Sequence, residues 1–140
     1  MKIKDLSWLQ VVLLFIGVIF TSWVLYSEPM SNFWLNLYFY SFLIFLVTWL
    51  MGIYVLRAGN KSLQLILQKR LVATLSIGAF LTTVNFGLSA CNFYNKRFCA
   101  PTCRVGIDNP LVSPCFYGAI IFLISLWVAI KLYKKFKKVQ

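Results

Sequence analysis

The stretch Phe33–Leu56, FWLNLYFYSFLIFLVTWLMGIYVL, decides the fold, because it has no charged residue and exceeds the roughly 20 apolar residues that a spanning helix needs. Three further runs have the same character, namely Trp8–Tyr26, Leu71–Ala90 and Phe116–Tyr133. Within the four runs only Lys131 is charged, and it lies about one turn from an end, where its long side chain can reach the interface. We therefore predict an all-α integral membrane protein, a four-helix transmembrane bundle.

The composition supports lipid as the solvent of this chain. Of the 140 residues, 61% are hydrophobic and 12% are charged, whereas an ordinary soluble domain has roughly 25% charged residues. A water-soluble fold of this size cannot hide so much apolar surface, so most of it must face the bilayer. Neither an internal repeat nor a low-complexity tract divides the sequence, and we expect a single domain over residues 1–140.

The distribution of positive charge predicts the orientation. The net charge is +11, and the basic residues gather at the ends of the apolar runs as topology signals, so we expect no nucleic-acid partner. Short loops rich in Lys and Arg stay in the cytoplasm, which places both termini and the 57–70 loop there. Eleven basic residues lie on that side (Lys2, Lys4, Arg57, Lys61, Lys69, Arg70, Lys131, Lys134, Lys135, Lys137 and Lys138) and three on the other (Lys96, Arg97 and Arg104).

The first apolar run is expected to remain in the protein. It is longer than the 7–15 residues of a signal-peptide core, and no small-x-small cleavage site follows it. We therefore expect a multi-pass protein of the cytoplasmic membrane in a prokaryote, or of the endoplasmic reticulum or plasma membrane in a eukaryote.

The link before the third run leaves two interpretations open. Leu63, Ile66, Leu67 and Arg70 recur at helical spacing. The segment 61–70 either lies on the membrane surface as an amphipathic helix or extends the third spanning helix into the cytoplasm.

All four cysteines, Cys91, Cys99, Cys103 and Cys115, lie in the predicted external loop 91–115. An even number confined to the exported side is typical of two disulfides in an oxidising compartment. A Cys91–Cys115 bridge would staple helices three and four and leave Cys99–Cys103 as an inner ring, while pairing 91–99 with 103–115 is nearly as attractive. We predict a short disulfide-bonded loop and leave its connectivity open.

Four helices with two cysteine pairs on the outer face resemble the plan of the bacterial disulfide-generating quinone reductases and the vitamin K epoxide reductases. The resemblance implies thiol–disulfide exchange with a quinone cofactor, carried by Cys99, Cys103, Cys91 and Cys115. Those enzymes place a C-x-x-C at the membrane surface, where a thiolate forms readily, whereas the closest pair here is Cys99-Ala100-Pro101-Thr102-Cys103. We expect structural bridges, and no metal site, because zinc knuckles also use a close C-x-x-C pair.

The run Leu71–Ala90 is predicted to occupy the most crowded position in the bundle. Small residues at four-residue spacing let helix backbones approach closely. We expect them to pack within the chain, with contact to another subunit as the alternative. They are Thr74, Gly78 and Thr82, beside Ala79, Thr83 and Gly87.

Asn36 and Asn85 are the polar residues that we single out within the spans, both near the external face. Each needs a hydrogen-bond partner in lipid. We expect interhelical hydrogen bonds, with a quinone or lipid head-group pocket as the alternative.

The functional expectation rests on what the sequence lacks. It has no histidine, the commonest general base, and its three acidic residues, Asp5, Glu28 and Asp108, all lie outside the apolar runs. We expect a small non-enzymatic accessory, assembly or interaction subunit without a cofactor, whose partners are the lipid bilayer and other membrane proteins or a second copy. A membrane thiol oxidoreductase using a quinone is the alternative, and a small transporter or channel subunit is a third.

Overall fold

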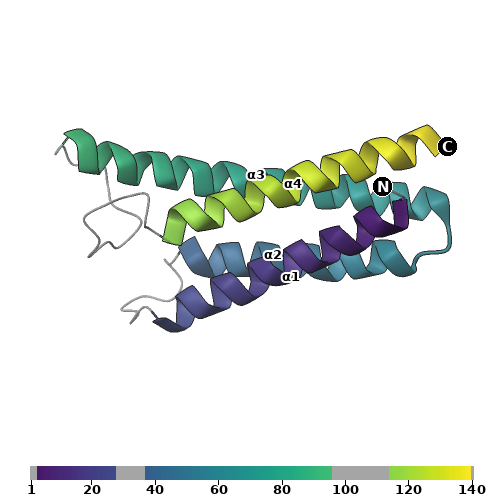
Figure 1. Cartoon of the computed structure of the whole chain (residues 1–140), viewed down its shortest axis with the longest axis horizontal. Helices are drawn as coiled ribbons and strands as arrows, with labels where there is room; N and C mark the ends of the chain where they lie inside the picture. The colour runs from purple at the N-terminus through teal and green to yellow at the C-terminus, as the bar shows by residue number, and fades with distance from the viewer. Residues whose placement is uncertain (1–2, 28–36, 96–113, 140) are drawn as a thin grey trace.

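The computed structural model describes residues 3–27, 37–95 and 114–139, which form four α-helices in one bundle (Figure 1). The helices are α1 (Ile3–Ser27), α2 (Leu37–Arg57), α3 (Lys61–Asn95) and α4 (Pro114–Val139). Each contains a segment long and apolar enough to cross a membrane. The predicted all-helical class with four candidate spans is therefore confirmed.

Helix α3 is longer than the bilayer is thick. Its 35 residues correspond to about 52 Å at the usual rise per residue, compared with a hydrocarbon core of about 30 Å. The additional length includes residues 61–70, which are continuous with the rest of α3. Of the two interpretations of that segment, the structure therefore has the extension of the spanning helix.

A short link over residues 58–60 joins α2 to α3 through local hydrogen bonds. Asn60 caps α3, because its Oδ1 accepts a hydrogen bond from the Ser62 backbone N–H at 3.0 Å. Gln64 Nε2 donates to the carbonyl oxygens of Ala58 and Val55, at 2.5 and 3.3 Å. These bonds satisfy carbonyl groups at the end of α2 and hold the two helices in an antiparallel turn.

Each helix packs mainly against two others, so that the bundle has two diagonals. Helix α1 contacts α2 and α4, and α3 contacts the same two helices. The diagonal pairs are therefore α1 with α3 and α2 with α4. Fully or nearly fully buried apolar side chains from all four helices fill the centre, among them Leu14, Phe45, Leu71, Leu75, Phe122 and Ala129.

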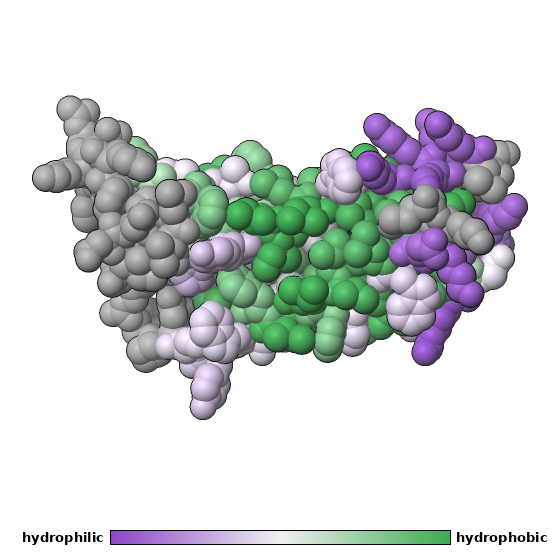
Figure 2. All heavy atoms as spheres, in the orientation of Figure 1, coloured by the Kyte–Doolittle hydropathy of each residue, from purple (hydrophilic) through white to green (hydrophobic). Residues whose placement is uncertain are grey.

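The outer surface is apolar in the middle and basic at one end (Figure 2). Large apolar side chains on every helix remain exposed, for example Ile16, Val47, Ile77 and Leu123. Aromatic residues near helix ends are also exposed, as is usual at the membrane–water interface. They include Trp8, Trp23, Tyr26, Tyr54 and Tyr117. This surface fits a multi-pass membrane protein.

We call the end that contains both described termini and the 58–60 link the basic end, and the opposite end the far end (Figure 1). Because the chain runs up and down, the described Lys and Arg side chains all gather at the basic end. Their positions are Lys4, Arg57, Lys61, Lys69, Arg70, Lys131, Lys134, Lys135, Lys137 and Lys138.

Candidate functional site

Two stacked phenylalanines fill the middle of the bundle. Phe45 of α2 and Phe122 of α4 lie with ring centroids 3.9 Å apart and an interplanar angle of 24°, and neither side chain is exposed. Each ring is seated on a glycine: a Cβ added at Gly17 would lie 2.8 Å from Phe45 Cζ, and one at Gly78 would lie 2.9 Å from Phe122 Cζ. We call these four residues the ring layer. The α2–α4 diagonal is thus closed by packing.

The six small residues singled out on α3 fall on different faces of that helix. Gly78, Ala79 and Thr82 are buried, and Thr74 is half-buried. Thr83 and Gly87 are exposed, and a Cβ at Gly87 would meet nothing within 4 Å. The structure therefore places half of the predicted set inside the bundle and leaves Thr83 and Gly87 on its outer surface.

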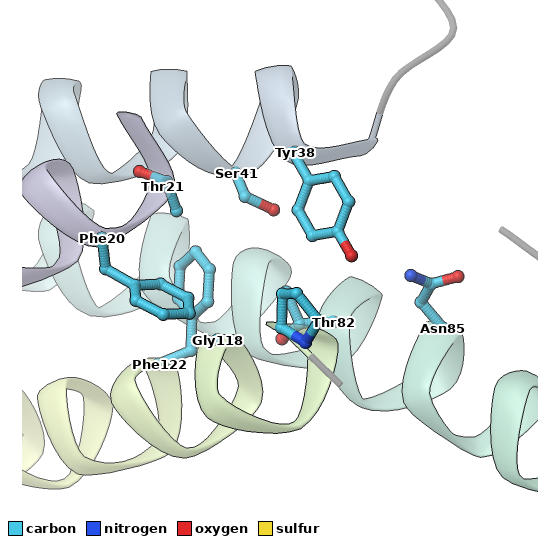
Figure 3. Close-up of a pocket in the computed structure, with 9 residues that line it drawn as sticks. Phe20, Thr21, Tyr38, Ser41, Thr82, Asn85, Gly118 and Phe122 are labelled. Carbon is cyan, nitrogen blue, oxygen red and sulfur yellow. The ribbon is translucent and has the colours of Figure 1, made fainter. Parts of the chain in front are cut away.

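A small cavity lies on the far-end side of the ring layer, and we call it the far-end cavity (Figure 3). Its volume is about 20 Å³, which is enough for about one water molecule. Polar and apolar side chains from all four helices surround it. They are Phe20, Thr21, Tyr38, Ser41, Thr82, Asn85, Pro114, Gly118 and Phe122.

The two threonines of the far-end cavity are bonded to their own helices. Thr21 Oγ1 donates to the Gly17 carbonyl oxygen at 2.8 Å, and Thr82 Oγ1 donates to the Gly78 carbonyl oxygen at 2.9 Å. Each hydroxyl oxygen keeps acceptor capacity after donating its proton. These residues make the cavity wall polar without using their donated hydrogen bonds to join helices.

Asn85 lies on the wall of the far-end cavity and is 5% exposed. Its amide and the Tyr38 hydroxyl point toward one another across the cavity (Figure 3). Asn36, the other asparagine predicted near this face, lies outside the described residues. Of these two asparagines, the described part of the chain includes Asn85 alone, and it lines the far-end cavity.

A second buried polar group, on the basic-end side of the ring layer, was missed from the sequence. Gln68 Nε2 donates to Gln10 Oε1 at 2.8 Å and to the Ala129 carbonyl oxygen at 3.0 Å, and Gln10 Nε2 donates back to Gln68 Oε1 at 3.4 Å. Both side chains are at most 1% exposed. We call Gln10 and Gln68 the glutamine pair. It joins α1 to α3 across the other diagonal and also reaches α4.

One of these glutamines was recognisable from its position. Gln10 lies within the apolar run Trp8–Tyr26, where a polar side chain needs a partner. Gln68 gave no such signal, because it lies in the 61–70 segment, which was also compatible with a water-exposed link.

The cysteine prediction falls largely outside the described part of the chain. Cys91 is half-buried about one turn before the end of α3, and Cys115 is the second residue of α4, although the placement of its side chain is not described. Cys99 and Cys103 lie outside the described residues. Within residues 3–27, 37–95 and 114–139, no three His, Cys, Asp or Glu side chains gather into a metal-binding group.

Two clusters of buried polar groups, the far-end cavity and the glutamine pair, thus lie on opposite sides of the ring layer, while the buried hydroxyl groups of Ser7, Thr48 and Ser125 belong to neither cluster. One cluster has room for about one water molecule, and the other is closed by reciprocal amide hydrogen bonds.

The chain matches no protein-family model, and comparisons with curated proteins and with solved structures found no significant match.

Proposed function

We propose that this protein is a small non-enzymatic polytopic membrane protein, an accessory, assembly or interaction subunit that presents a disulfide-pinned loop outside the cytoplasm. The observation that carries the proposal is the ring layer, which fills the bundle between its two polar clusters. The described interior is thus used for holding the helices together. Specific interactions with partners would then be made by the outer surface of the bundle and by the cysteine loop.

The same packing argues against the two alternatives. A transporter or channel needs a polar route through the bilayer, whereas Phe45 and Phe122 interrupt the polar side chains along the bundle axis. In the oxidoreductase alternative the quinone would bind near the cysteine loop, at the far end, and would need a volume of about 300 Å³ or more, whereas the far-end cavity has about 20 Å³. The interior is therefore better suited to a scaffold.

The proposed orientation has the basic end in the cytoplasm and the far end outside. It is supported by the concentration of exposed Lys and Arg at the end that contains both described termini. With native thiols blocked, a membrane-impermeant label should react with Ser31→Cys and miss Ser62→Cys in intact cells. Labelling of Ser62→Cys in intact cells would reverse the orientation.

If the protein is a scaffold, it should stay bound to a partner and should not turn over a substrate. Full-length protein isolated in mild detergent from its own host should retain a defined membrane-protein partner or a second copy, identified by mass spectrometry. Alkylation without reductant should find no free thiol if the loop is bridged. Two or more alkylated cysteines would favour a redox or metal role.

A comparison of single cysteine variants separates the scaffold from the oxidoreductase. In an exchanging pair, one remaining thiolate traps the substrate as a mixed disulfide that the other normally resolves. Cys99→Ser and Cys103→Ser should therefore be examined on non-reducing gels from the native host. Equal behaviour of the two variants without a trapped band supports the proposal, and a reducible higher-mass band from only one of them contradicts it.

A further inference from the structure

A groove at the basic end is lined by residues of α1 and α4. Its volume is about 410 Å³, roughly twenty times that of the far-end cavity. The three lysines that line it share one face of α4, because they are spaced at i, i+3 and i+4. Its lining residues are Leu6, Leu9, Trp127, Lys131, Lys134 and Lys135. We call it the basic groove.

The basic groove changes character along the membrane normal. Trp127 and Leu9, which lie deeper in the membrane than Leu6 and the lysines, are 57% and 40% exposed and open toward lipid. Lys134 and Lys135 lie about two helical turns closer to the C-terminal end of α4 than Trp127 does. An occupant that matches the groove therefore has a negative charge at the interface and an apolar portion that continues toward the middle of the bilayer.

Lys131 holds its charge at the boundary between these two parts. Its Nζ lies 3.7 Å from the centroid of the Trp127 ring, in the geometry of a cation–π contact. Side chains on a helix lean toward its N-terminus, which for α4 is toward the middle of the membrane. Instead of extending to the basic end, Lys131 thus presents its ammonium group deeper than Lys134 and Lys135 do.

We propose that the basic groove binds an anionic phospholipid, with its phosphate among Lys131, Lys134 and Lys135 and an acyl chain along Leu9 and Trp127. Charge complementarity selects the headgroup, since basic pockets between transmembrane helices suit anionic lipids. The exposed apolar wall selects a lipid over a free anion, which has no apolar portion to place there. This inference is independent of the proposed accessory role.

The test measures lipid retention by the purified full-length protein in mild detergent, using native mass spectrometry. Phosphatidylglycerol and phosphatidylcholine serve as anionic and zwitterionic probes. The groove variant Lys131→Gln/Lys134→Gln/Lys135→Gln should retain phosphatidylglycerol at least tenfold less well than the wild type. The control variant Lys69→Gln/Arg70→Gln/Lys138→Gln changes the net charge equally outside the groove lining and should stay within about threefold.

A second pair of variants leaves the charge, and hence the topology signal, unchanged. Leu9→Trp adds bulk to the groove wall and should lower phosphatidylglycerol retention about threefold or more. Leu63→Trp places the same side chain on an exposed position of α3 outside the groove and should have no effect. This pair decides the question if the triple groove variant fails to insert.

Three results would overturn the proposal. Equal losses in the groove variant and its matched control, in either pair of variants, would show that lipid retention does not depend on the groove lining. Equal retention of phosphatidylcholine and phosphatidylglycerol by the wild type would remove the headgroup preference. Displacement of phosphatidylglycerol by millimolar inorganic phosphate alone would identify a free-anion site instead of a lipid site.

Discussion

The two diagonal pairs of helices in the bundle are joined by different kinds of contact. Across α2 and α4, Phe45 and Phe122 stack and are seated on Gly17 and Gly78, so that fit alone joins the helices. Across α1 and α3, the glutamine pair exchanges hydrogen bonds and also binds the Ala129 carbonyl. The ring layer tolerates almost no added volume, whereas the glutamine pair requires complementary donors and acceptors.

This difference has a physical cause in the membrane environment. Lipid tails are as apolar as the helix surfaces, so helices associate through close packing and hydrogen bonds rather than through the hydrophobic effect. The ring layer uses dispersion contacts that depend on shape. The glutamine pair uses the cost of leaving an amide unbonded in an apolar interior. Each mechanism makes its own prediction when one member is removed.

The largest effect is expected for Phe122→Ala. Removing the ring leaves a cavity next to Gly78 and removes the stacking partner of Phe45, which should lower the free energy of unfolding by about 3–5 kcal/mol. Thermal unfolding in detergent measures the change. Phe80→Ala is the matched control, because Phe80 is 68% exposed on α3. If both variants are destabilised equally, the ring layer is not a special contact.

Gly78→Ala tests the fit of the ring layer without removing a ring. The new methyl group would contact Phe122, which is held between Gly78 and Phe45, so we expect destabilisation of about 1–3 kcal/mol from overpacking. Gly87→Ala adds the same methyl group where nothing lies within 4 Å and should unfold at or above the wild-type temperature. A harmless Gly78→Ala would mean that the ring layer is loosely packed.

A double-mutant cycle tests the hydrogen-bonding diagonal. Gln68→Leu leaves the Gln10 amide unsatisfied and should cost about 1–2 kcal/mol. Gln10→Leu/Gln68→Leu removes both amides and should recover most of that loss, because no orphaned polar group remains. The unfolding free energies of the wild type, Gln10→Leu, Gln68→Leu and the double variant together give the coupling energy between the two side chains. Additive losses would show that the two side chains act independently.

The smallest effect is expected at Ser125, which lies on α4 between Phe122 and Ala129. It is fully buried, and its Oγ has no hydrogen-bond partner among the described residues. Ser125→Ala should therefore raise stability by about 0–1 kcal/mol. Ser76→Ala, at an exposed serine bonded to the Val72 carbonyl, should change little. Destabilisation by Ser125→Ala would reveal a partner for this hydroxyl.

Much of the fold was accessible from hydropathy, and much of the site was not. The four apolar runs predicted the four helices, and Asn85 was singled out before the structure placed it at the far-end cavity. The glutamine pair was not predicted, because Gln68 lies in the segment 61–70, whose pattern was equally compatible with a helix on the membrane surface. Its burial follows from the continuous length of α3, which brings it opposite Gln10.

The amino-acid sequence by itself determined that four segments are long and apolar enough to cross a membrane, and which segments carry positive charge. These are local, additive properties of a stretch of residues. Only the tertiary structure decided which side chains meet across the diagonals and which lysines share the basic groove. Apolar residues surround these helices on nearly all sides, so periodicity does not mark an inward face. Helix rotation is instead set by the fit of rings on glycines and by paired amides.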